Sequence, residues 1–379
     1  GADRSLIALL GELGLSEEIE WRTTNTLFFD GEQHYPLNNA LDYLRLPVLP
    51  LIAKCRIAIN IVYAGARSKR GRLETLTAEQ LLSRWSGRAA YVQLWGPLRR
   101  SKLGVNYDRV SAAYIWSVIR RFYGAREGGQ RTERFGYMPG GYAHVLSTML
   151  SALNDRGVEC LTASPVRDIA AAGGSGVALT YANEVHHFDQ VIATFAGPQF
   201  AALVPTLPTP ERQRHADLPY QGVVCLSLLL TRPLGGGYMT YITDESVPFT
   251  TVIEMSALTG TGEYGDHHLV YLPRYVPADD PLLGADDQSI ANTFIAGLTR
   301  LYPDFDAQQV VAQHIARAQY VMTVPVCNYS EQLPPLQTSI AGLWVCNSAH
   351  IVDASLSVNE AVALANRSAP QILSRREGS

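Results

Sequence analysis

The sequence lacks a large excess of charge of either sign, and it has few cysteines. Its 379 residues include 31 Lys and Arg against 35 Asp and Glu, a formal net charge of −4. We therefore expect no basic surface for the phosphates of nucleic acids. The five cysteines are scattered, and no CxxC pair occurs. An odd number of separate cysteines in apolar surroundings is typical of buried, reduced thiols, which favours a cytoplasmic protein.

Motifs that carry chemistry in side chains are also missing. There is no GxSxG turn, no Walker A loop and no GxGxxG between a strand and a helix. No apolar run reaches the roughly 20 residues of a membrane helix, so we expect no integral membrane segment. His186 and His187 are adjacent on an expected strand and point to opposite faces, so we predict no metal site. Redox chemistry by a bound cofactor suits these absences, because cofactors supply reactions that side chains cannot perform.

The apolar periodicity predicts a mixed α/β chain in which helical and strand-rich blocks alternate. Helices are expected over residues 4–15, 77–85 (with a capping box from Thr77 to Gln80), 111–121, 142–156, 209–218, 287–302 and 358–373. A hairpin is expected over residues 26–37, and strands over 159–162, 165–173, 176–182, 184–189, 190–197, 222–231, 238–244, 248–255, 268–276, 314–326 and 342–350. Such interleaving indicates two domains that the chain enters more than once.

Two consecutive glycines, Gly140 and Gly141, stand directly before the expected helix 142–156, in the stretch RFGYMPGGYAHVLSTML. Glycine adopts backbone conformations that other residues avoid, so the pair indicates a tight turn into the helix.

The stretch GYMPGGYAHVLSTMLSALNDRGVECLTASPVRDI, followed by FDQVIATFAGP, resembles the flavin-dependent amine oxidase / protoporphyrinogen oxidase superfamily. Further stretches resemble the same superfamily in the same order: LWGPLRRSKLGVNYDRVSAAYIW, PFTTVIEMSALTG, HLVYLPRYVPADDPL and PVCNYSEQLPPLQTSIAGLWVCNSAHIVDASLSVNEAVALANR. The resemblance covers nearly the whole chain. It depends on the order and spacing of these stretches, since no single motif is decisive.

The resemblance implies an α/β fold in which an FAD-binding domain of the glutathione-reductase type is interleaved with a helix-plus-sheet substrate domain. The implied FAD-binding domain comprises residues 1–14, 130–205 and 335–379, and the implied substrate domain comprises 15–129 and 206–334. The superfamily's first βαβ unit, which carries GxGxxG, is not in this sequence. The FAD-binding domain is therefore expected to be N-terminally incomplete, with the unit clipped, supplied by a partner chain or lost.

The resemblance also implies which residues contact FAD. Val166 matches the position beside the adenine, and Asn347 and Ser348 match a turn near the pyrophosphate and ribityl chain. Val358, Asn359 and Ala361 match a helix start facing the flavin ring, where free amides and the helix dipole stabilise an anionic reduced flavin. From the residues alone, Val166 equally fits a core strand and Asn359 equally fits a helix cap.

The function implied is an FAD-dependent oxidoreductase that removes hydride from a C–N or C–C bond of a mostly apolar small molecule. No catalytic side chain is assigned. The expected substrate contacts are Gly140, Gly141, Glu254, Tyr271, Arg274, Tyr275 and Tyr329. The last five of these also fit ordinary polar positions of a sheet. Leu356 and Ser357 stand where the superfamily has an arginine and a glycine. This departure favours the alternative, a flavin-free or degenerate homologue that acts as a non-catalytic binding or assembly partner.

Overall fold

The computed structural model describes residues 3–38, 40–47, 49–66, 71–124, 134–173, 176–235, 237–352 and 354–374. The chain forms two compact units and enters each more than once. Unit 1 contains Glu18–His144 and Tyr220–Cys327, and unit 2 contains Asp3–Glu17, Val145–Pro219 and Asn328–Ser379. Helices and strands alternate in both, so the mixed α/β class expected from the sequence is confirmed.

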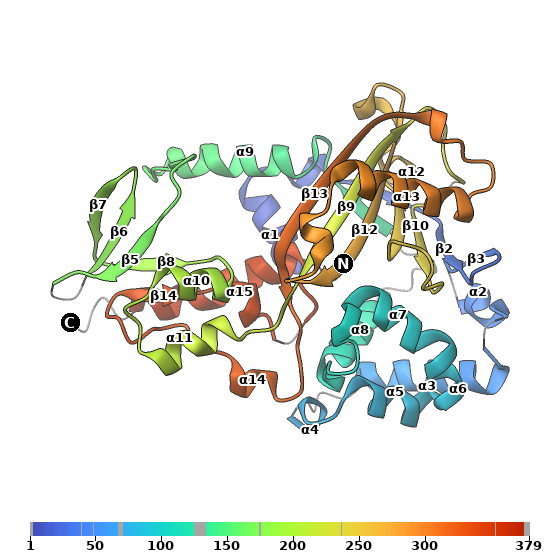
Figure 1. Ribbon diagram of the computed structural model, residues 1–379, viewed down its shortest axis with the longest axis horizontal. Helices are drawn as coiled ribbons and strands as arrows, with labels where there is room; N and C mark the ends of the chain where they lie inside the picture. Colours follow the sequence, from blue (N-terminus) through green and yellow to red (C-terminus); the bar gives the residue numbers. More distant parts are fainter. Residues whose placement is uncertain are drawn as a thin grey trace. The chain divides into compact units, whose positions relative to one another are not determined.

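Unit 1 is built on one seven-stranded sheet (Figure 1). In spatial order the strands are β13 (Val310–Thr323), β9 (Tyr220–Leu230), β12 (His268–Pro277), β11 (Thr251–Glu254), β10 (Met239–Ile242), β2 (Thr26–Phe29) and β3 (His34–Pro36). All neighbours are antiparallel except β10 and β2, which run parallel. The expected hairpin over 26–37 is confirmed as β2 and β3.

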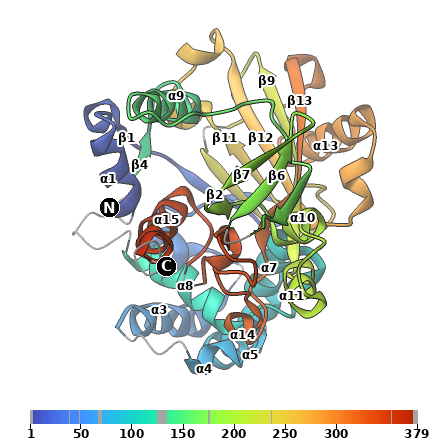
Figure 2. The same ribbon diagram turned by 90° about the vertical axis from the view of Figure 1, so that its left-hand side faces the viewer.

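One face of this sheet is sealed by helix α13 (Asp287–Leu301), which lies beside β13 and β9 in Figure 2. Alternate residues of β9 are completely buried, among them Leu226 and Leu228, as are their partners on β12. Phe294 of α13 packs into the same cluster. The period-two burial therefore defines a closed face, and the side chains between these residues belong to the opposite face.

Most other helices of unit 1 precede the long strands in the chain. They are α2 (Ala40–Arg45), α3 (Leu51–Ala66), α4 (Gly71–Glu74), α5 (Ala78–Ser86), α6 (Arg88–Ala90), the π-helical turn η2 (Tyr91–Trp95), α7 (Gly96–Leu103) and α8 (Ala112–Gly124), whereas the short α12 (Ser256–Thr259) lies between β11 and β12. The expected capping box is confirmed at α5, where Thr77 accepts the amide of Gln80 at 3.2 Å and the Gln80 side chain accepts the amide of Thr77 at 3.0 Å.

Unit 2 contains a parallel pair, β8 (Val191–Ala193) with β14 (Leu343–Val345), and an antiparallel sheet of β5 (Asp168–Ala171), β6 (Val177–Tyr181) and β7 (Glu184–Phe188). Its helices are α1 (Arg4–Glu12), α10 (Gly197–Leu203), α11 (Thr209–Ala216), α14 (Tyr329–Gln332) and α15 (Val358–Leu373). Helix α9 (Gly141–Asn154) begins in unit 1 and continues in unit 2. The core includes Ile169, Phe200 and Leu343.

The strand expected over 159–162 is wrong. Residues 159–162 have no regular structure, and Val158 and Leu161 are exposed. A strand requires a neighbouring strand for its backbone hydrogen bonds, and none of the described strands pairs with this segment. The local β propensity is therefore not sufficient here.

Gly297 provides a test of the α13 packing. A Cβ at this position would lie 2.5 Å from Cδ of Pro248, which belongs to a rigid ring. Replacing a helical glycine by alanine ordinarily stabilises a protein by about 1 kcal/mol. We expect Gly297→Ala instead to lower the midpoint of thermal unfolding. Gly11→Ala in α1, where the nearest atom is the mobile Ser16 hydroxyl at 3.3 Å, should leave it unchanged or raise it.

His215 predicts a pH dependence. Its side chain is buried and its ring lies 4.7 Å from that of Phe200, and burial lowers its pKa to about 4. The unfolded chain therefore takes up a proton near pH 6.5 that the folded chain does not. We expect stability to fall between about pH 6.5 and 4, by roughly 3 kcal/mol from this group. His215→Phe should make this loss smaller in urea unfolding across that pH range, and an unchanged loss would contradict the assignment.

Candidate functional site

The half-buried face of the unit 1 sheet, opposite the α13 core, is rich in tyrosine. Tyr271 pairs with Ser227 and Tyr275 pairs with Val223, so these side chains share a face with Cys225 between them. All three are half-buried. We call Cys225, Tyr271 and Tyr275 the tyrosine face. Tyr114 of α8 interacts electrostatically with Tyr275, and its buried hydroxyl has no hydrogen-bond partner among the described residues.

The titratable groups of the tyrosine face are held in their neutral forms. Burial raises the pKa of the Cys225 thiol to about 11 and that of Tyr114 to about 12. Burial also raises the pKa values of Tyr271 and Tyr275, and Cys225 adds to both shifts. A thiol with so high a pKa is a poor nucleophile at neutral pH. The face can therefore contact an apolar molecule and exchange hydrogen bonds, but it offers no anionic side chain for attack.

Two expected substrate contacts do not lie on the tyrosine face. Glu254 pairs with Val270 and lies on the same closed face of the sheet, where it is 2% exposed. Its Oε1 accepts a hydrogen bond from the amide of Leu234 at 3.3 Å and lies 4.0 Å from Nδ1 of His268. Arg274 alternates with Tyr275 and donates to the carbonyl of Pro248 at 3.0 Å. The structure therefore brings Tyr271 and Tyr275 together and separates them from Glu254 and Arg274.

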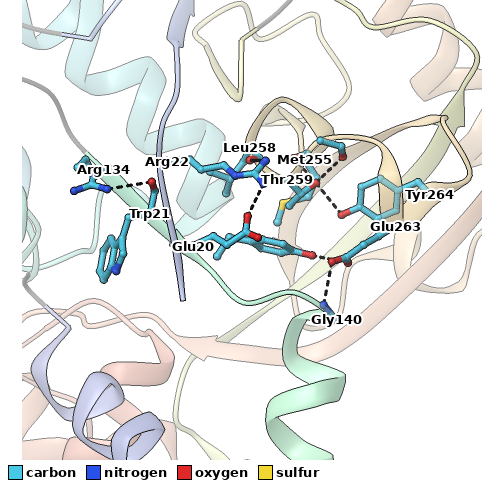
Figure 3. Close-up of polar contacts among 12 residues, drawn as sticks. Glu20, Trp21, Arg22, Arg134, Gly140, Met255, Leu258, Thr259, Glu263 and Tyr264 are labelled. Carbon is cyan, nitrogen blue, oxygen red and sulfur yellow. Dashed lines mark hydrogen bonds and ion pairs between the residues drawn. The ribbon is translucent and has the colours of Figure 1, made fainter. Parts of the chain in front are cut away.

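The glycine turn before α9 is held by a carboxylate (Figure 3). Gly140 and Gly141 have φ values of +75° and +61°, so both occupy the left-handed region that favours glycine. Oε1 of Glu263 accepts a hydrogen bond from the Gly140 amide at 3.1 Å, and Oε2 accepts one from the Tyr137 hydroxyl at 2.6 Å. Burial and the bond to Glu263 raise the pKa of Tyr137. One side chain thus fixes both sides of the turn.

The strand before this turn is also anchored in unit 1. Strand β4 (Arg134–Tyr137) pairs with β1 (Glu20–Thr23), and Arg22 of β1 donates to the carbonyl of Leu258 at 3.1 Å. Nε2 of His144, in the first turn of α9, lies 2.8 Å from Oε2 of Glu18. The start of α9 is therefore positioned by contacts from several segments of unit 1.

Tyr329 belongs to unit 2, whereas the other expected substrate contacts belong to unit 1. It is 2% exposed, and its hydroxyl donates to the carbonyl of Ala349 at 2.9 Å. The bond ties α14 to the turn that follows Asn347 and Ser348. Its contacts are those of a buried structural residue.

The expected pyrophosphate turn follows the carboxyl end of β14. In open α/β sheets, ligands bind outside the carboxyl ends of the parallel strands. Asn347 follows β14 and its Nδ2 donates at 2.7 Å to the carbonyl of Phe195, which follows the parallel strand β8. Its Oδ1 accepts the amide of Ala349 at 3.0 Å at the start of the turn that Ser348 opens. Val166 is half-buried against the unit 2 core.

The expected flavin-facing residues form the start of α15. Ser357 caps the helix by accepting the amide of Glu360 at 3.4 Å, and Val358 is 39% exposed. Asn359 is buried, and its Oδ1 accepts the amides of Ser5 at 2.9 Å and Leu6 at 3.1 Å, so it caps α1 from another helix. Ala361 is exposed on the second turn. The amide oxygen of Asn359 is thus engaged within the protein.

The described residues hold no group of three or more His, Cys, Asp or Glu side chains placed to bind a metal ion. None of the helices they form is long and apolar enough to cross a membrane. All five cysteines are free thiols, but the expectation that each is buried is wrong, because Cys55 and Cys160 are exposed and the other three are half-buried. Cys160 is exposed because it lies in the segment that pairs with no described strand.

The sequence did not point to Glu263, Tyr137 or Tyr114. The only local signal was the Gly140–Gly141 turn, whose amide needs an acceptor. The acceptor lies 123 residues away in sequence, and no local pattern identifies it.

The sequence pattern of the family described as flavin containing amine oxidoreductase matches residues 1–373. Among curated protein sequences, none matches. Solved structures with the same fold include a candidate protoporphyrinogen oxidase from Exiguobacterium sp. 255-15, with a TM-score of 0.73 and 14% identity over 98% of this chain and 85% of that one. An oxidoreductase from Methanosarcina mazei has a TM-score of 0.70 and 16% identity, over 97% of this chain and 85% of that one. Cyclohexylamine oxidase from Brevibacterium oxydans IH-35A has a TM-score of 0.65 and 15% identity, over 99% of this chain and 86% of that one.

Glu263→Gln tests the role of the carboxylate in the glycine turn. The amide side chain can still accept one bond but replaces a charged acceptor by a neutral one, and we expect a loss of about 1–3 kcal/mol in the free energy of unfolding. The matched control is Glu159→Gln, because Glu159 is exposed in an irregular segment. Equal urea midpoints for the two variants would contradict the role given to Glu263.

Proposed function

The chain belongs to the family of flavin-containing amine oxidoreductases, and from this premise we propose that it removes hydride from a C–N or C–C bond of a mostly apolar small molecule. FAD is the cofactor that membership of the family implies. When bound, FAD accepts the hydride, so the side chains of this chain need only bind, orient and shield the substrate.

The observation that supports this proposal is the chemistry of the tyrosine face. It is half-buried and neutral, and beside it lies the buried Tyr114 hydroxyl, which has no partner within the protein. A buried hydroxyl without a partner costs about 1–3 kcal/mol, which a bound molecule with a polar atom would recover. Neutral aromatic walls with a few hydrogen-bonding groups are typical of sites for small apolar ligands.

The residues at the start of α15 fit one edge of a flavin. The first amides of a helix have no partner within the helix, and the dipole there favours negative charge. Val358 leaves an apolar side chain exposed beside these amides. A flavin ring has an apolar plane and an acceptor edge that becomes negative on reduction, so it matches both features. Asn359 would contribute its backbone, because its side-chain oxygen caps α1.

Near the pyrophosphate of the cofactor, the Asn347 side chain would shape the backbone and would not itself contact FAD. Its amide is bonded to Phe195 and Ala349, so it shapes the turn that carries Ser348. Val166, on the same unit, would contact the adenine. We accordingly propose unit 2 for FAD binding and unit 1 for substrate binding, with Gly140 and Gly141 at the passage of the chain from one to the other.

Probes for the reaction follow from the neighbours' names. Cyclohexylamine tests hydride removal from an apolar C–N bond, and protoporphyrinogen tests removal from a C–C bond. All five cysteines are free thiols, and free thiols are typical of proteins in a reducing compartment. We therefore propose that the protein is cytoplasmic.

Val358→Glu separates flavin binding from folding. A carboxylate in the first turn of a helix favours the fold through the dipole, but it would repel the acceptor edge of a flavin. We expect the dissociation constant for FAD to rise at least tenfold, measured by flavin fluorescence, with no fall in the unfolding midpoint. The control is Ala365→Glu, an exposed position later on the same helix.

Equal FAD affinity in the two variants would contradict the site at α15. Wild-type protein that is colourless, and that FAD does not stabilise thermally, would contradict catalysis by this chain. That result would instead support the alternative of a binding or assembly partner.

A further inference from the structure

Arg99 of α7 is a buried cation in the helical part of unit 1. The residue is 4% exposed. Its Nη1 donates at 2.9 Å to the hydroxyl of Tyr91, which belongs to the π-helical turn η2. Turns of this kind often occur at functional sites. The guanidinium also lies 5.7 Å from the ring centres of both Tyr91 and Tyr107.

Two other donors of Arg99 have no acceptor in the part of the chain that the structure describes. Nε and Nη2 are shielded from solvent, and neither makes a hydrogen bond there. These two nitrogens lie along one edge of the planar guanidinium, and their N–H bonds point in parallel toward the same side. This is the edge with which arginine binds the two oxygens of a carboxylate or a phosphate.

The nearby carboxylates are already paired with other arginines. Glu79 forms an ion pair with Arg88 and accepts the Tyr91 hydroxyl at 3.3 Å, while Glu245 forms an ion pair with Arg100. Among the described residues, the printed contacts of Arg99 reach a carboxylate through Tyr91. Burial lowers the pKa of its guanidinium. An unpaired buried charge is costly, and a partner that satisfies its donors would recover that cost.

We propose that the Nε–Nη2 edge of Arg99 is a binding site for an oxyanion, a carboxylate or phosphate group of a small molecule. Two parallel acceptor oxygens would satisfy both unpartnered donors and neutralise the buried charge. The half-buried Tyr107 covers this guanidinium and that of Arg100, at 5.7 and 5.3 Å. The site does not depend on the proposed redox reaction, because it requires no cofactor.

The test is anion-dependent thermal unfolding of the full chain in an anion-poor buffer at constant ionic strength. Sodium acetate, sodium benzoate and inorganic phosphate are the probes. We expect at least one to raise the midpoint saturably, with a half-effect concentration at least tenfold higher in Arg99→Lys, which keeps the charge but loses the planar fork. Arg100→Lys is the matched control, because Arg100 is the next residue and already has a partner; it should respond as the wild type. A response to acetate or benzoate assigns a carboxylate, and a response to phosphate alone assigns a phosphate group.

No saturable response in the wild type, or an equal response in Arg99→Lys, would overturn the proposal. A second measurement uses only the wild type, in case Arg99→Lys fails to fold. Crystals soaked in the probe should show it within hydrogen-bonding distance of Nε and Nη2 of Arg99. Bound probe elsewhere, with none at this edge, would equally overturn the site.

Discussion

The two faces of the unit 1 sheet differ in burial, and the rest of the structure depends on this difference. One face is closed, because Leu226, Leu228 and their β12 partners have no exposed surface beneath α13. The strict alternation of a strand then places Cys225, Tyr271 and Tyr275 on the other face, where they remain half-buried. Any slip of one residue in register would exchange the two sets, so packing under α13 fixes which side chains a ligand can meet.

Some polar side chains position the backbone, whereas others have no partner among the described residues. Glu263 fixes the glycine turn, Asn359 caps α1, and Asn347 joins the ends of β8 and β14. Each of these side chains is engaged within the protein. Tyr114 and Arg99 are the contrast, because each belongs to the described residues with buried polar atoms that have no hydrogen-bond partner among the described part of the chain. An unsatisfied buried group calls for an explanation, and for these two we propose a bound molecule.

The sequence predicted the mixed α/β class, the capping box at Thr77 and the hairpin of β2 and β3, because each depends on local pattern. It failed for residues 159–162, where strand formation depends on a partner strand. It also grouped Glu254 with Tyr271 as substrate contacts, although their pairing partners, Val270 and Ile253, place them on opposite faces. The acceptor of the Gly140 amide could not be predicted from local pattern, because Glu263 lies 123 residues away in the sequence.

The central claim is that substrate meets the tyrosine face while FAD accepts the hydride. Anaerobic reduction of the FAD-loaded protein tests it most directly, with cyclohexylamine and protoporphyrinogen as probes. In Ser227→Trp a bulky ring fills the face opposite Tyr271. We predict that one probe bleaches the wild-type flavin, and that the variant retains FAD but is bleached at least a hundredfold more slowly. Equal bleaching rates in the two proteins would contradict the account.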